Sequence, residues 1–266
     1  MQETHHDFRT LSVDYPQKKG VPMHNEFEGS WLATASGGMW SIENPQEVQV
    51  HLRDIAAGLS RTCRYAGQIS EEAEFYSVAE HSVIMTSWAH RTGRVRTRSE
   101  ALLYLLHDGS EAYFGDMPTP LKALIPDFRR LEDRAQNVIY RAFGIGDGTV
   151  RALKPELKRI DTRVRMDERE VMILEPALGA GREALWKLDP DLEPLGVKPL
   201  MMSPFDARET FLRAFCWALQ ALPDDLGETR ALRGAAIFLQ DREIIPEIPD
   251  FSTNKEASCE TAFSPC

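Results

Sequence analysis

The chain has 266 residues, of which 42% are hydrophobic, and its formal net charge is −10. This length is enough for one large domain or two small ones, with a sizeable apolar core. The negative charge argues against a general nucleic-acid-binding protein, because contacts to a phosphate backbone need a basic surface. It leaves room for a small phosphorylated molecule held by one or two local cations.

The cysteines and the amino-terminal residues indicate the compartment. None of the four cysteines belongs to a CxxC pair, so the sequence contains neither a disulfide framework nor a zinc-finger spacing. The first residues, MQETHHDFRT, lack an apolar signal region, and no apolar run of 18 residues occurs. We therefore expect a soluble protein of a reducing cytoplasm, without a membrane or nucleic-acid partner.

The amino-terminal part of the chain predicts an extension, a hairpin and a helix. Residues 1–30 are polar and aperiodic, which favours a flexible extension. Short apolar runs flank the turn residues Ser36-Gly37-Gly38 and predict a small β-hairpin from Trp31 to Ile42. Apolar residues at helical spacing then predict a helix from Pro45 to about Arg64.

The rest of the chain is predicted to be helical between glycine and proline signals. Thr97 and Glu100 have the spacing of a capping box at one helix start, and Asp206 and Glu209 have it at another. Residues 176–205 contain many prolines and glycines and predict a long excursion. The helices are expected at Val78–His90, Ser99–Phe114, Asp127–Phe143, Pro155–Leu174 and Asp206–Leu222, with a short one at Thr229–Phe238. The predicted fold is one all-α domain over residues 31–222, with the small hairpin at its start and a largely disordered extension over 223–266.

The stretch LLHDGSEAYFGDMPTPLK carries an unusual amount of charge beside a Leu-rich segment. His107 and Asp108 follow the apolar residues, Glu111 comes one turn later, and Asp116 lies in the turn that Gly115 begins. A lone His-Asp dipeptide is common by chance and is typical of a surface histidine beside a solvated aspartate. The dipeptide therefore needs support from other helices.

Two other predicted helices supply that support. His81 lies in the apolar segment YSVAEHSVIM. Along the helix that follows Pro155, one face is apolar except at Asp161 and Glu168. A buried carboxylate is costly unless it is paired or binds a metal, so Asp161 is either a metal ligand or the partner of a basic residue such as Arg64 or Arg165. Imidazole and carboxylate ligands together favour Mn, Fe, Co, Ni or Zn over Ca.

These residues also carry a family resemblance. The order H…HD…D resembles the HD-domain metal-dependent phosphohydrolases, whose fold is a helical bundle. HDGSEAYFGDMPTPLK is similar to the HDxxExxxGDxPxPxK segment of the YfbR-like 5′-deoxynucleotidases and related phage enzymes. The upstream segments IAAGLSRTCRYAG and FYSVAEHSV resemble the same group, so the resemblance covers about residues 31–175.

The resemblance implies a metal site and two catalytic carboxylates. Glu111 would orient or deprotonate the attacking water. Asp116 would donate a proton to the 5′ oxygen or hold the sugar, although an aspartate after a glycine also suits a plain turn. The resemblance places one divalent ion, expected to be Co, Mn or Zn, on four ligands: His81, His107, Asp108 and Asp161.

The resemblance also implies four substrate contacts. Arg64 matches the phosphate-binding arginine, unless it is a surface arginine at a helix end. Tyr65 takes the aromatic position beside it, where the ring would pack on the deoxyribose and exclude a 2′ hydroxyl; its own hydroxyl leaves that selectivity open. Thr119 would lie on a rigid turn between two prolines, near the sugar. Lys122 would add positive charge or be solvated.

The function expected from the sequence is metal-dependent hydrolysis of 2′-deoxynucleotide phosphates. The substrate is a deoxynucleoside 5′-monophosphate or, as in phage dATP triphosphohydrolases, a dNTP. The alternative is a catalytically silent HD-fold module that binds a nucleotide as a regulator or scaffold. The resemblance further implies a bacterial cytosolic or phage-encoded protein that forms a homodimer or a larger homo-oligomer.

Overall fold

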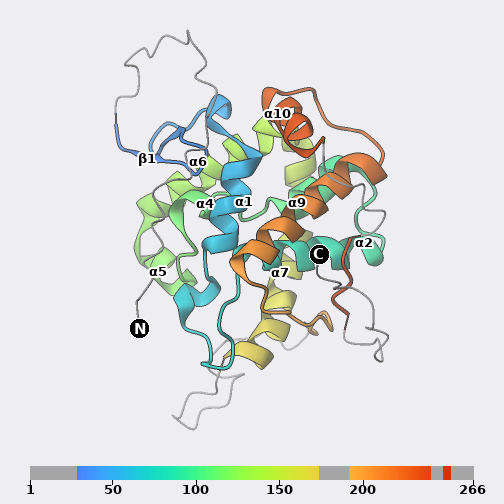
Figure 1. The fold of residues 1–266 in the computed structure, drawn as a ribbon. Coiled ribbons are helices and arrows are strands. Elements are labelled where there is room, and N and C mark those ends of the chain that lie inside the picture. The colour runs from blue at the N-terminus through green and yellow to red at the C-terminus, as the bar shows by residue number, and fades with distance from the viewer. Residues whose placement is uncertain (1–28, 174–191, 241–247, 253–266) are drawn as a thin grey trace, which may run out of the picture.

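The structure is a computed structural model that describes residues 29–173, 192–240 and 248–252. This part of the chain is mostly helical and begins with a two-stranded antiparallel hairpin, which confirms the predicted fold class (Figure 1). None of its helices is long and apolar enough to cross a membrane. In chain order the elements are β1 (Trp31–Ala33), β2 (Met39–Ser41), the 3-10 turn η2 (Glu47–Gln49), α1 (Leu52–Arg61), the 3-10 turn η3 (Arg64–Gly67), α2 (Val78–Arg91), α3 (Arg98–Leu105), α4 (Glu111–Phe114), α5 (Thr119–Leu124), α6 (Pro126–Ala142), α7 (Asp147–Met172), α9 (Pro204–Ala221) and α10 (Arg230–Leu239).

The predicted hairpin is present and is attached to α1. Leu32 pairs with Trp40 in the middle of the ladder, and Gly37 has a φ of +83° at the turn, a conformation that favours glycine. The backbone N–H and the hydroxyl of Ser36 donate to the buried carboxylate of Asp54, at 2.6 and 2.8 Å. The turn therefore satisfies a charge in the first turn of α1 that would otherwise be costly to bury.

The helix α2 lies at the centre of the molecule. It packs against α1, α3, α7 and α9, and all its residues from Val78 to Ala89 are buried. Polar side chains on such a helix need partners inside the protein. Glu80 has them, because its carboxylate accepts the backbone N–H groups of residues 200–202 at 2.5 to 3.2 Å.

The helix predicted from Pro45 begins later, at Leu52. Residues 47–49 form one 3-10 turn, which Gln46 and Gln49 close by reciprocal side-chain contacts. Val50 and His51 then adopt extended φ and ψ values, so the chain changes direction before α1 starts. Val48, which precedes Leu52 at helical spacing and suggested the earlier start, is 47% exposed, whereas Val50 is buried.

The helix predicted over Ser99–Phe114 is wrong in its middle. Residues 106–110 form turns between α3 and α4. Gln136 of α6 holds these turns, because its amide accepts the N–H of Ser110 at 2.9 Å and donates to the carbonyl of Leu106 at 2.6 Å. His107 and Asp108 therefore project from a turn that a neighbouring helix fixes.

Three further helix starts differ from the prediction. Thr119 opens α5 instead of a turn, because Pro120 fits the first turn of a helix, where its missing N–H needs no partner. The helix α7 begins at Asp147 and contains Pro155 in its interior. The hydroxyl of Ser203, and not Asp206, caps α9 by accepting the N–H of Asp206. The expected helix end at Leu174 and most of the excursion over 176–205 lie outside the described residues.

The packed core continues beyond residue 222. The predicted helix at 229–238 is present as α10, capped by Thr229. Its Leu239, together with Ile248 and Phe251, belongs to the buried core. The described part of 223–266 is thus packed on the helices and is not a loose extension, whereas residues 1–28 and 253–266 lie outside the description.

Candidate metal centre

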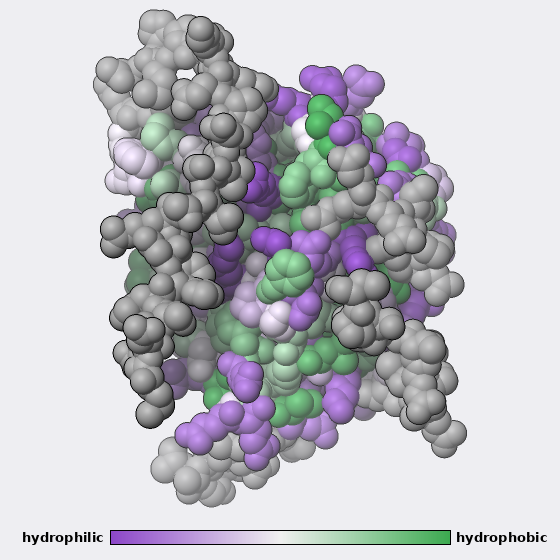
Figure 2. Space-filling model, in the orientation of Figure 1, coloured by the Kyte–Doolittle hydropathy of each residue, from purple (hydrophilic) through white to green (hydrophobic). Residues whose placement is uncertain are grey.

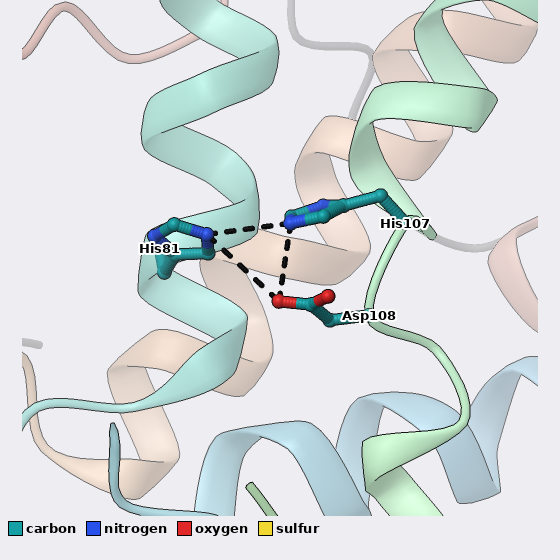
Figure 3. A group of neighbouring side chains, drawn as sticks. All are labelled: His81, His107 and Asp108. Carbon is teal, nitrogen blue, oxygen red and sulfur yellow. Dashed lines mark hydrogen bonds and ion pairs between the residues drawn. The ribbon is translucent and has the colours of Figure 1, made fainter. Parts of the chain in front are cut away.

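Three sequence-predicted ligands converge from two elements. His81 comes from the first turn of α2, and His107 and Asp108 come from the turn between α3 and α4 (Figure 3). The Nε2 atoms of the two imidazoles are 3.3 Å apart, and Asp108 Oδ2 lies 3.1 Å from that of His107 and 3.9 Å from that of His81. One ligand atom from each residue lies within 4.8 Å of the others, a spacing that could hold a metal ion.

In each imidazole, the nitrogen that points away from the cluster, Nδ1, has an acceptor of its own. His81 Nδ1 lies 2.5 Å from the carboxylate of Glu168, and His107 Nδ1 lies 2.9 Å from the carbonyl of Tyr104. Both partners are acceptors, so each Nδ1 carries a hydrogen and donates it, and each Nε2 faces the cluster. The two Nε2 atoms lie 3.3 Å apart beside the Asp108 carboxylate, a donor set that fits a cation.

Asp161 of α7 borders the cluster and has a second partner. Its Oδ1 lies 3.4 Å from His81 Nε2, and its Oδ2 forms an ion pair with Arg165 at 3.1 Å. The two alternatives for this residue are therefore compatible, because each uses a different oxygen. Burial would raise the pKa of Asp161, but the hydrogen bond with His81 and the charge of Arg165 lower it, which keeps the carboxylate ionised.

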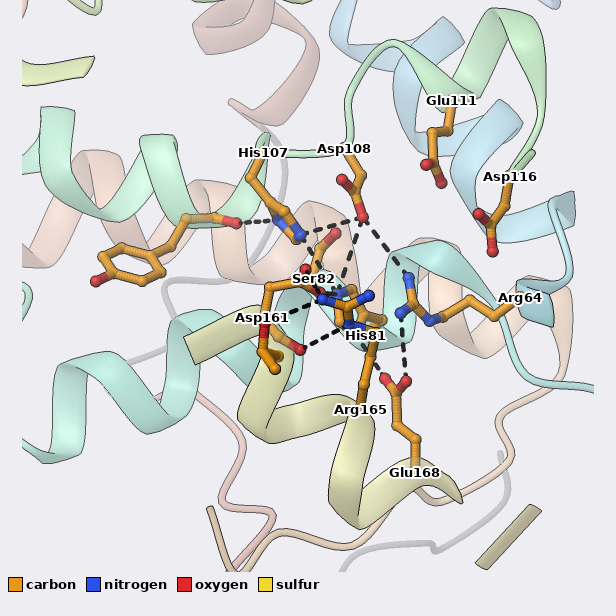
Figure 4. Close-up of polar contacts among 12 residues, drawn as sticks. Arg64, His81, Ser82, His107, Asp108, Glu111, Asp116, Asp161, Arg165 and Glu168 are labelled. Atoms are coloured by element: carbon orange, nitrogen blue, oxygen red, sulfur yellow. Dashed lines mark hydrogen bonds and ion pairs between the residues drawn. The ribbon is translucent and has the colours of Figure 1, made fainter. Parts of the chain in front are cut away.

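Glu168 connects the cluster to its surroundings (Figure 4). Its Oε1 accepts from Tyr76 at 2.7 Å and contacts His81, while its Oε2 accepts from Tyr65 at 2.7 Å and from Arg64 at 3.3 Å. Burial would raise the pKa of this carboxyl, but the Arg64 guanidinium and His81 hold it well below its usual range. The sequence singled out Glu168 as a polar residue on an apolar face but gave it no role of its own.

Arg64 is buried and is not a surface arginine. Its Nη1 lies 3.6 Å from Asp108 and its Nη2 lies 3.3 Å from Glu168, so the guanidinium joins the His-His-Asp cluster to the carboxylate behind it. The next two residues, Tyr65 and Ala66, have φ values of +57° and +53°. Residues with side chains rarely adopt this left-handed conformation, and such strain is concentrated at functional sites. Here it lets the backbone N–H of Tyr65 donate to Asp116 at 3.1 Å.

Glu111 lies in a buried position beside the cluster. Its Oε1 accepts from Lys122 at 3.3 Å, and Lys122 also donates to Glu132 of α6 at 2.7 Å. Its Oε2 is buried and has no hydrogen-bond partner among the described residues. Burial and the charges of Asp108 and Asp116 raise the pKa of Glu111 well above its usual value, although Lys122 and Arg64 oppose them. Lys122 is thus half-buried and paired with two carboxylates.

The predicted site residues do not all meet. Figure 4 shows Glu111 and Asp116 near Asp108 and Arg64. Thr119, in contrast, is exposed at the start of α5 and has no hydrogen bond to the other site residues in the described part of the chain. Sequence reasoning missed Tyr76 and Glu132. Tyr76 lies 92 residues from Glu168, so no local pattern signals their contact, and Glu132 reaches Lys122 from the next helix, ten residues on.

Comparison with known proteins shows which family includes the chain. No family model matches it. The chain is 35% identical over 116 residues to the uncharacterized protein YfdR of Escherichia coli strain K12. The matched segment is 44% of this chain and 60% of that protein. It is 32% identical over 134 residues to the uncharacterized protein RCAP_rcc00048 of Rhodobacter capsulatus. This second matched segment is 50% of this chain and 68% of that protein. The chain therefore belongs to the same family as RCAP_rcc00048.

Proposed function

We propose that this member of the RCAP_rcc00048 family is an HD-type, metal-dependent phosphohydrolase that removes phosphate from 2′-deoxynucleotides. The observation that carries the proposal is the His-His-Asp cluster with a buried guanidinium beside it, 3.6 Å from Asp108. Cations on both sides of a phosphate offset the negative charge that develops during its transfer. The resemblance of the motifs to the YfbR-like 5′-deoxynucleotidases supports the substrate class.

The four expected ligands fit a divalent transition ion such as Co, Mn or Zn. When bound, such an ion would polarise the phosphate and lower the pKa of a water molecule toward neutrality. Glu168 and the Tyr104 carbonyl orient the two imidazoles through their Nδ1 atoms. This support keeps the Nε2 atoms available without a rearrangement of the protein.

The remaining side chains divide the chemistry between them. Arg64, anchored by Glu168, binds phosphate oxygens through the rest of its guanidinium. Glu111, one oxygen of which has no hydrogen-bond partner in the described part of the chain, orients or deprotonates the attacking water. Asp116, positioned by the N–H of Tyr65, holds the sugar or gives a proton to the departing 5′ oxygen.

Tyr65 has a proposed role in sugar selectivity. Its hydroxyl donates to Glu168, so this group is engaged within the protein and is not available to a 2′ hydroxyl. The ring also lies beside the Arg64 guanidinium, 5.5 Å from its carbon. We propose that the ring packs on the deoxyribose and leaves no room for a ribose oxygen.

A turnover panel tests this function. Deoxynucleoside mono- and triphosphates and the matching ribonucleotides are incubated with the protein and Co, Mn or Zn. We expect hydrolysis of deoxynucleotides, which chelation abolishes and added metal restores.

Two variants and a control assign the activity to the cluster. His107→Ala and Asp108→Ala should each lower turnover by about a hundredfold or more, because each removes a proposed ligand. His51→Ala should leave turnover unchanged, because His51 is exposed and its side chain forms no capping bond. Activity on ribonucleotides alone would contradict the sugar selectivity. Protein that neither contains metal nor gains activity from it would favour the silent nucleotide-binding module.

A further inference from the structure

A second group of cations lies on α1, outside the candidate metal centre. Arg53, Ala57 and Arg61 are spaced by four residues, so they share one face of the helix. The two arginines are separated by about 12 Å of helix axis, and the small side chain of Ala57 leaves a depression between them. Arg208 of α9 lines the same cavity, whose volume is 390 Å³ and which shares no residue with the metal cluster.

The positive charge of this cavity is poorly compensated. Neither Arg53 nor Arg61 forms an ion pair with a carboxylate among the residues that the structure describes. Arg208 contacts one acid, Glu209, at 3.2 Å. Three guanidinium groups around one cavity, in a chain of net charge −10, therefore form a local site of attraction for an anion.

An apolar cavity adjoins the arginine-lined one. Its volume is 430 Å³, and Arg53 and Phe238 line both cavities. Val48, Ile237 and Phe238 line the apolar cavity and are 47%, 67% and 38% exposed, respectively. Figure 2 shows hydrophilic and hydrophobic side chains next to each other on the face where α1, α9 and α10 lie.

We propose that the two cavities form a second nucleotide-binding site, for a nucleoside polyphosphate. Arg53, Arg61 and Arg208 bind its phosphates, because planar guanidinium groups form paired hydrogen bonds with phosphate oxygens. The base lies on the apolar surface that Val48 and Ile237 line, because contact there removes its flat apolar face from water. A ligand with one charged and one flat apolar part fits both cavities and the residues that they share.

Equilibrium binding in the presence of EDTA tests this site independently of catalysis. Deoxyadenosine triphosphate is titrated into the full-length protein by calorimetry, with inorganic tripolyphosphate as the comparison. We expect saturable binding that weakens with added salt, because the contacts are charged and partly exposed. Tripolyphosphate should bind about tenfold more weakly, because it lacks the base.

Two double variants locate the binding on the chain. Arg53→Gln with Arg61→Gln should weaken deoxyadenosine triphosphate about tenfold or more. Arg151→Gln with Arg213→Gln removes the same charge from exposed positions outside both cavities and should leave the affinity unchanged. Thermal melting of both variants should show that the fold persists, because all four arginines are exposed.

Two results would overturn the proposal. One is an affinity for deoxyadenosine triphosphate that the Arg53 and Arg61 substitutions leave unchanged, or a parent protein that does not bind this nucleotide. The other is equal affinity for tripolyphosphate, which would mean a plain phosphate site without a base. Because the titration contains no metal and no turnover, failure here leaves the proposed hydrolase untouched, and the reverse also holds.

Discussion

Glu168 receives four polar groups on two oxygens, and its charge is needed for all of them. Arg64 and Tyr65 contact one oxygen, and His81 and Tyr76 contact the other. A neutral amide in the same place would turn its NH2 toward two donors and leave the Arg64 charge without a buried partner. Both changes are costly in a site that is closed to water.

Glu168→Gln is therefore expected to lower the free energy of unfolding by about 3 kcal/mol. It should also weaken metal binding by about tenfold or more, since His81 loses the acceptor that orients its ring. Chemical denaturation and metal titration measure the two effects. Glu170→Gln, an exposed position on the same helix, is the control. A Glu168→Gln protein with unchanged stability and metal affinity would contradict this role.

The raised pKa of Glu111 leads to a prediction about pH. Burial and the charges of Asp108 and Asp116 raise this pKa, and Lys122 lowers it. A general base works only when ionised, so turnover should rise as pH increases through the pKa of Glu111. Lys122→Met removes an opposing charge and should raise that pKa, moving the acid side of the profile to higher pH by about one unit.

The measurement is kcat/KM against pH for both proteins. Lys154→Met, at an exposed position on α7, should keep the original profile. If Lys122→Met lowered turnover equally at every pH, Lys122 would act on substrate binding and not on the ionisation of Glu111.

At the scale of elements, a close approach of two helices positions Glu111. A Cβ added at Gly58 of α1 would lie 2.5 Å from the carbonyl oxygen and 2.7 Å from the Cα of Ala112 in α4. Backbone atoms cannot move aside as a flexible side chain can, so α4 would have to shift. Glu111 precedes Ala112 and would shift with it.

Gly58→Ala should therefore cost about 1–3 kcal/mol of stability and reduce turnover, even though Ala is the better helix former. Gly234→Ala in α10 is the matched control, because nothing lies within 4 Å of its added Cβ. It should be neutral or stabilising by up to about 1 kcal/mol. Thermal melts and kcat measure both proteins, and a Gly58→Ala enzyme as stable and active as the parent would contradict this explanation.

At the scale of the whole molecule, the described residues after 222 complete the core. Leu239, Ile248 and Phe251 are buried against the helices, and the Lys198 N–H donates to the Phe251 carbonyl at 2.9 Å. Burial of each such side chain contributes about 1.5–3 kcal/mol. Their sum is comparable with the total stability of an ordinary domain.

A chain ended after Leu222 should therefore unfold at a much lower temperature than the full chain, or fail to fold. A chain ended after Ser252 keeps the three core residues and is the comparison. Circular dichroism during heating measures both. If the shorter chain melted within a few degrees of the longer one, the segment after 222 would be dispensable for the fold.

The sequence by itself determined the features that depend on local spacing. The hairpin, α2, α6, α10 and the all-α class followed from apolar periodicity and from the glycines and prolines between elements. The motif resemblance further selected His81, His107 and Asp108, which the structure brings within reach of one ion. For Asp161 the sequence left open a place beside His81 or an ion pair with a basic residue such as Arg165. Asp161 contacts both His81 and Arg165 in the structure.

Only the tertiary structure decided which contacts hold those residues in place. The turn that carries His107 is fixed by Gln136, and Glu168 joins Arg64, Tyr76 and His81. Each of these partners lies far away in the chain, where periodicity carries no information about it. A local pattern determines which face of a helix is buried, but the partner of a buried charge depends on how the helices pack, and that packing is a property of the whole chain.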